Sequence, residues 1–134
     1  MDDLFFVGRL IFGGFFAFNG ATLLLTNAQS AQYAAAKGIP MPEVAVAVAG
    51  LLILAGGLSL LTGFLPHMGV GCIVLFLAVV TPTMHAFWTE SGPERLADMI
   101  NFTKNIALLG GALTMLAVPR PWPYSIERRA RIAA

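Results

Sequence analysis

Charged residues are scarce in this chain. Its 134 residues include 8 Lys and Arg and 7 Asp and Glu, together 11%, whereas 57% of the residues are hydrophobic. The mean hydropathy is +0.79. Soluble domains carry about 25% charged residues, so this chain has too few to cover a soluble surface. The same figures exclude disorder, a coiled coil and collagen, and a net charge of +1 argues against nucleic-acid binding. One integral membrane domain, 1–134, remains.

Residues that bind metals or form disulfides are also few. Cys72 is the single cysteine, which excludes a disulfide framework and a CxxC pair. His67 and His85 are the two histidines, and 18 helical residues between them would span about 27 Å. They cannot hold one ion within a monomer, so we expect no metal site. No nucleophile, base and orienting residue can be assembled, so we predict no catalytic residue.

Four apolar runs predict four membrane-spanning helices. A bilayer core about 30 Å thick needs roughly 20 helical residues to cross it. The runs lack the alternation of barrel strands, and lipid leaves helices as the other way to satisfy the backbone. The predicted fold is therefore all-α, a transmembrane four-helix bundle. Its spans are residues 4–26, 44–65, 68–88 and 99–118, and a basic tail follows at 119–134.

The first outer loop, residues 27–42, is predicted to hold a short surface helix. Asn27 or Ser30 would cap its start, and Gly38 would end it. Before the first span, the leader Met1-Asp2-Asp3 is acidic, and no small-residue cleavage pattern follows the span. We therefore do not expect a cleavable signal peptide.

Basic residues set the predicted orientation. Arg9 and the four arginines of the tail lie on one side of the predicted bundle. The other side has only Lys37, Arg95 and, at its edge, Lys104. Because basic residues are enriched in cytoplasmic segments, we expect both termini to be cytoplasmic.

Polar side chains within the spans are the candidate functional residues, because they are expensive in lipid. The last span carries a polar stripe, and residues of the first and third spans reach the same outer half. These residues predict an outward-facing pocket between the first, third and fourth spans. Its candidate ligand-binding residues are Asn19, His85, Asn101, Lys104 and Asn105. The alternative is that the same side chains hydrogen-bond the helices together without binding a ligand.

Two of the polar residues have further interpretations. His85 is either a hydrogen-bonding group for a quinone-like carbonyl or an interfacial histidine. Arg9, the candidate polar residue of the inner side, either faces the bundle or extends to the inner head groups. For Lys104, the nearest predicted acidic partners are Asp98 and Glu43.

Several segments resemble the DoxX family of small four-helix bacterial membrane proteins. They are RLIFGGFFAFNGATLL, the loop KGIPMP, FTKNIALLGG and the tail PYSIERR, in the same order along nearly the whole chain. The resemblance implies a multi-pass protein of the bacterial inner membrane that is at most a membrane subunit of an oxidoreductase. It marks Arg9, His85, Lys104 and Asn105 as family positions.

The chain departs from the family pattern at two ionisable positions. Leu23 stands where the family often has Lys, and Ile53 or Leu54 stands where it often has Glu. Both losses weaken a direct role in redox chemistry or proton transfer.

Two main functions follow from these features. The first is an accessory subunit of a quinone-linked redox system, with quinone as the candidate cofactor. The second is a non-catalytic membrane scaffold or assembly partner. A small-molecule transporter is less favoured, because the span 44–65 has no charge or helix break at its middle. Expected partners are the lipid bilayer, a redox partner protein and a second copy of the chain, but no nucleic acid.

Overall fold

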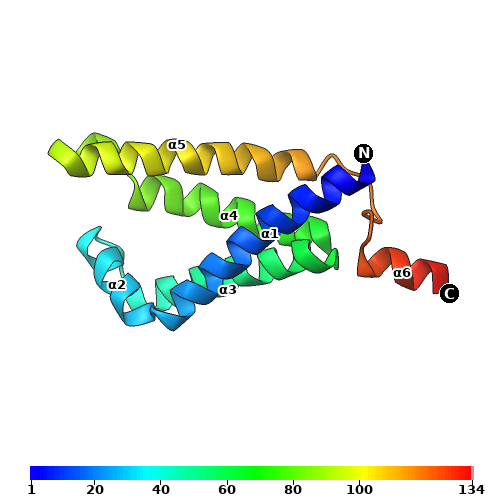
Figure 1. Cartoon of the computed structure of the whole chain (residues 1–134). Coiled ribbons are helices and arrows are strands. Elements are labelled where there is room, and N and C mark those ends of the chain that lie inside the picture. The colour runs from blue at the N-terminus through cyan, green and yellow to red at the C-terminus, as the bar shows by residue number, and fades with distance from the viewer. Residues whose placement is uncertain (134) are drawn as a thin grey trace.

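The computed structural model describes residues 1–133, and this part of the chain is helical and contains no strand (Figure 1). The prediction of an all-α fold is confirmed. The elements, in chain order, are α1 Asp2–Leu25, α2 Asn27–Ala36, α3 Pro42–Thr62, α4 Pro66–Met84, the 3₁₀ helix η1 Phe87–Thr89, α5 Gly92–Met115 and α6 Ile126–Ala133.

The four long helices α1, α3, α4 and α5 overlap the four predicted spans, with bounds that differ by up to seven residues. Within the described residues, α1, α3 and α4 with its extension to Thr89 are long and apolar enough to cross a membrane. The fourth, α5, has 24 residues but is more polar, because the stripe from Asp98 to Asn105 lowers its hydropathy. Three clear spans are therefore present where the sequence predicted four, and α5 packs beside α4 as the fourth helix of the bundle.

Proline and positive-φ residues fix the short connections. Gly63 ends α3 at φ 68°, and Leu65 at φ 46° leads directly into Pro66, the first residue of α4. This geometry gives the tight hairpin that the sequence predicts, since glycine reaches positive φ at little cost and proline suits the first helical turn.

The predicted surface helix is confirmed as α2, which is inclined to α3 (Figure 1). Its first turn differs from the prediction, because neither Asn27 nor Ser30 caps the helix. Thr26 is the N-cap, and no side chain donates or accepts a capping bond there. Asn27 Nδ2 instead donates to the carbonyl of Glu43 at 3.0 Å, which ties the start of α2 to the start of α3.

Glycines bring α1 and α3 into direct backbone contact. A Cβ atom at Gly57 would lie 2.6 Å from the carbonyl oxygen of Gly13, and one at Gly20 would lie 2.8 Å from that of Gly50. No side chain fits at these crossings. Close approach of this kind gives van der Waals contact between helices in lipid, where hydrophobic burial contributes little.

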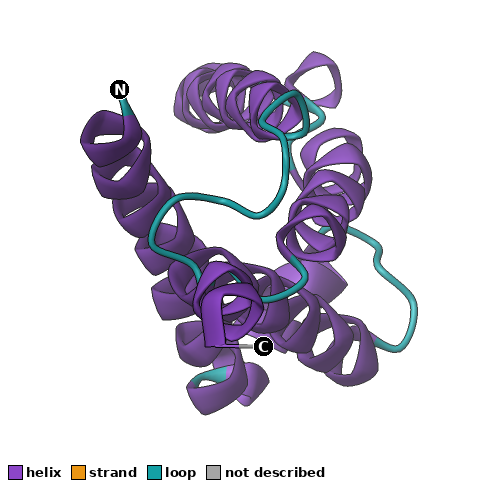
Figure 2. Ribbon diagram, turned by 90° about the vertical axis from the view of Figure 1, so that its right-hand side faces the viewer, coloured by secondary structure: helices purple, strands orange, loops and turns teal. Residues whose placement is uncertain are grey.

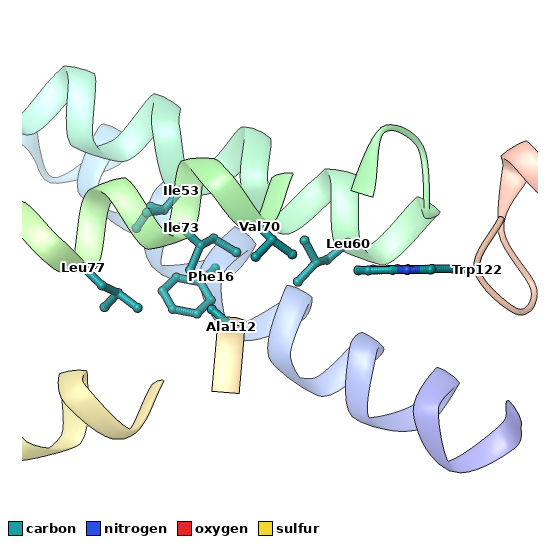
Figure 3. Packing of buried hydrophobic residues seen from close by; sticks show 8 residues of the cluster. All are labelled: Phe16, Ile53, Leu60, Val70, Ile73, Leu77, Ala112 and Trp122. Atoms are coloured by element: carbon teal, nitrogen blue, oxygen red, sulfur yellow. The ribbon is translucent and has the colours of Figure 1, made fainter. Parts of the chain in front are cut away.

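The core forms where α1, α3, α4 and α5 meet (Figure 3). Large apolar residues on the outer faces, such as Ile11 and Phe18, are instead exposed, as expected of side chains that face lipid. The buried core residues are Phe16, Ile53, Leu60, Val70, Ile73, Leu77, Ala112 and Trp122.

Replacing one interface glycine tests this packing. We expect Gly57→Ala to lower the free energy of unfolding by about 1–3 kcal/mol, because the added methyl group meets the α1 backbone. Thermal unfolding in detergent measures the change. The matched control is Gly110→Ala, since a Cβ at Gly110 has no neighbour within 4 Å. The control should be unchanged or up to ~1 kcal/mol more stable. Equal stability of the two variants would contradict the close α1–α3 contact.

Candidate functional site

A groove of about 840 Å³ lies between α2, α3 and α4. Its walls are largely apolar, with Ala49 and Leu52 from α3 and Phe76 and Val79 from α4. Polar side chains come from α2 and from the C-terminal end of α4: Gln29, Ser30, Tyr33, Thr83 and His85. The groove therefore offers a long apolar surface with a small number of hydrogen-bonding groups, which is typical of sites for hydrophobic ligands.

His85 belongs to an ionic cluster centred on Asp98. His85 Nδ1 lies 3.0 Å from Asp98 Oδ1, and Lys37 Nζ donates to Asp98 Oδ2 at 2.6 Å. Lys37 also donates to Glu90 Oε1 at 2.7 Å. Asp98 is only 4% exposed, and its bonds to Lys37 and His85 offset the cost of burying its charge. The cluster thus consists of Lys37, His85, Glu90 and Asp98.

Lys37 holds α2 in place. It is the C-cap residue of α2, whereas its two carboxylate partners lie on α5 and just after η1. The ammonium also lies 5.9 Å from the ring centroid of Tyr33. Hydrogen bonds from Lys37 to Asp98 and Glu90 raise the pKa of Lys37 above its ordinary value, so the ammonium stays charged. The ion pairs therefore fix the helix that forms one wall of the groove.

Of the five predicted ligand-binding residues, His85 alone lines the groove. Asn19 Nδ2 donates to the carbonyl of Phe15 on its own helix. Lys104 Nζ donates to Asn101 Oδ1 at 2.9 Å, also within one helix, and Asn105 is buried. Their role in binding stays a prediction.

The groove does not lie where the sequence predicted a pocket. The prediction set the pocket between the first, third and fourth spans, which are α1, α4 and α5, whereas the groove lies between α2, α3 and α4. The physical reason is the ionic cluster, in which Asp98 bonds to Lys37 and His85 rather than to Lys104. These bonds draw α2 toward the end of α4.

Sequence reasoning missed Lys37 and Glu90 and gave Asp98 only a place at the rim. Both missed residues lie in predicted loops, where charges are expected to be solvated. One sequence feature could have indicated the cluster. Lys37, Glu90 and Asp98 all fall on the predicted outer side of the membrane, and opposite charges tend to pair when they are partly shielded from water.

Arg9 faces the interior, which decides between its two interpretations. Its side chain is 1% exposed. Nη1 donates to the carbonyl of Pro123 at 3.1 Å and Nη2 to that of Tyr124 at 3.4 Å. The guanidinium also lies 5.1 Å from the Phe6 ring centroid. Arg9 is thus a buried cation held by backbone carbonyls.

The segment 119–125 closes this end of the bundle. Trp122 and Ser125 are both 0% exposed, and Tyr124 Oη donates to Asp3 Oδ1 at 2.8 Å. Figure 2 shows the loop between α5 and α6 crossing the helix ends. Both termini lie at this end (Figure 1), as an even number of long helices requires. That this end is cytoplasmic stays a prediction.

Comparison with known proteins identifies the family. The DoxX family model matches residues 4–86, more than half of the chain. The chain is also 30% identical over 99 residues to the inner membrane protein YphA of Escherichia coli (strain K12). The aligned region covers 73% of this chain and 69% of that protein. This chain belongs to the DoxX family. It is a multi-pass protein of the bacterial inner membrane. No solved structure gives a significant match.

The DoxX match includes the walls of the groove and His85 but ends before α5. Asp98 therefore lies outside the matched region, although it bonds directly to His85 within it. The ionic cluster joins the matched part of this DoxX protein to its last long helix.

Removing the central carboxylate tests the ionic cluster. Asp98→Asn should lower the free energy of unfolding by about 1.5–3 kcal/mol, because hydrogen bonds to charged groups contribute about that much. Thermal unfolding in detergent is the measurement. Glu94→Gln is the matched control, since Glu94 lies exposed on the same helix. The same melting temperature for both variants would show that the cluster does not hold α2.

A second substitution tests the closure by segment 119–125. Ser125→Cys in a Cys72→Ala background places a thiol at a fully buried position, so its reaction with a maleimide should be slow. Adding Arg9→Met removes both bonds to the segment and should speed labelling about tenfold or more. Arg129→Met is the control, because Arg129 is exposed. Equally slow labelling with Arg9→Met would mean that Arg9 does not hold the segment.

Proposed function

We propose that this DoxX protein binds a quinone in the groove between α2, α3 and α4, as an accessory subunit of a quinone-linked redox system. One observation carries the proposal: a groove of about 840 Å³ with apolar walls ends at a histidine. Small-molecule sites typically measure about 300–1,000 Å³. The apolar walls suit an isoprenoid tail, and His85 suits a carbonyl or hydroxyl on the ring.

His85 is oriented for this role by Asp98. Asp98 Oδ1 accepts a hydrogen bond from Nδ1–H of His85, which leaves Nε2 as the ring nitrogen for a ligand. A neutral imidazole then accepts a hydrogen bond at Nε2 from a hydroxyl, and a protonated one donates to a carbonyl. The histidine can therefore hold or release one proton at Nε2, while a bound quinone supplies the electron chemistry.

The scarcity of redox groups in the chain itself supports the accessory role. Cys72 is a single cysteine and cannot form a disulfide couple within one chain. Electrons would therefore come from a partner protein, and the DoxX subunit would hold the quinone beside it. The segment 119–125 supports binding over transport, because Trp122 and Ser125 are fully buried at one end of the bundle.

Filling the groove tests the proposal. Binding of a quinone analogue with a ten-carbon tail would be measured in lipid nanodiscs for the native chain and for Ala49→Phe. Ala49 lines the groove, so the added ring should weaken binding about tenfold or more. Ala78→Phe is the matched control, because Ala78 is exposed and does not line the groove; it should bind as the native chain does.

Three results would count against the proposal. They are a native chain that binds no quinone analogue, an Ala49→Phe variant that binds as tightly as the native chain, and equal losses in both variants. The scaffold function would instead be favoured if a partner protein bound only to the chain with an open groove and no quinone bound at all.

A further inference from the structure

Among the described residues, 1–133, the groove has no free cation at its polar end. None of its lining residues is Lys, Arg, Asp or Glu, and the titratable ones are Tyr33 and His85. Lys37 adjoins this end through Asp98, but its ammonium is bonded to two carboxylates, at 2.6 Å and 2.7 Å. It is therefore already neutralised by its own neighbours.

The cluster behind His85 has no excess positive charge. Lys37 contributes one positive charge, and Glu90 and Asp98 contribute one negative charge each. With a neutral imidazole the cluster is negative by one charge. With a protonated imidazole it is balanced. A ligand head group at His85 therefore meets a negative cluster when the imidazole is neutral and a neutral cluster when the imidazole is protonated.

This charge balance distinguishes between kinds of head group. An anionic head loses hydration in the groove and finds no unpaired cation, so its burial is costly. It is also repelled by Asp98, which bonds to the same imidazole. An uncharged hydroxyl or carbonyl has neither penalty and needs one hydrogen bond, which His85 supplies.

We propose that the groove selects amphiphiles with an uncharged, hydrogen-bonding head group and rejects those with a carboxylate or phosphate head. The inference rests on the proposed function, since it describes the ligand of the same groove. It predicts which membrane molecules compete for the site. Quinones, quinols and long-chain alcohols would enter, whereas fatty acids and anionic phospholipids would not, although both classes have tails that suit the apolar walls.

A matched pair of ligands tests the selectivity. Hexadecanol and palmitate have the same number of carbons and differ in the charge of the head group. Photoreactive forms of both would be incorporated into nanodiscs at about pH 8.5, where palmitate is ionised, at equal mole fractions in the bilayer. Labelled peptides from α3 and α4 would be quantified by mass spectrometry. We expect the alcohol to label the groove residues about tenfold more than the acid.

A substitution at Thr83 checks that charge is the cause. Thr83 lines the groove and is exposed, and its hydroxyl donates to the carbonyl of Val79 within α4. Thr83→Lys adds a cation and should raise labelling by palmitate about tenfold relative to the uncharged control Thr83→Gln.

Each result has a distinct meaning. Preference for the alcohol, reversed or abolished by Thr83→Lys, supports the inference. Equal labelling of the native groove by both probes, or preference for palmitate, overturns it and leaves ligand binding intact. A preference that Thr83→Lys does not change also overturns it. Labelling of the groove by neither probe, with no binding of the quinone analogue, overturns the inference and the proposed function together.

Discussion

The close crossing of α1 and α3 is the contact on which the bundle depends. Lipid gives little hydrophobic drive for helices to associate, so α1 and α3 pack by bringing backbone against backbone at glycines such as Gly13 and Gly57. Gly56 and Gly69 repeat the arrangement between α3 and α4. With α3 fixed between two helices, its remaining face is left for α2. The groove is the space that this arrangement leaves between α2, α3 and α4.

Asp98 joins helices by polar contacts, as these glycines join them by backbone contacts. One buried carboxylate bonds to Lys37 at the end of α2 and to His85 at the end of α4, and so joins three helices that are separate in sequence. Breaking such a buried pair is costly because it leaves an uncompensated charge. The same carboxylate orients the histidine at the polar end of the groove. The contacts between helices and the proposed ligand binding therefore involve the same residue in this DoxX protein.

Local sequence features predicted most of the fold and little of the site. Apolar runs, prolines and Gly63 act within a few residues, so the helices and their tight hairpin could be predicted from the sequence. His85 could be predicted as a ligand candidate because histidine is rare in lipid. The ionic cluster around it could not, since Lys37 and Asp98 are 61 residues apart and meet only when α2 folds back over α3. Arg9 posed the same difficulty, because its partners are carbonyls, which carry no sequence signal.

The Arg9 contacts impose an order on biogenesis. The carbonyls that accept its hydrogen bonds belong to residues made 114 and 115 positions later, after all four long helices have been synthesised. Until then, a guanidinium destined for the interior of the bundle has no native acceptor, and it must keep water or lipid phosphate around it. Arg9 therefore gains its native acceptors only after the tail has been made. The segment 119–125 of the tail is therefore packed as part of the helix bundle.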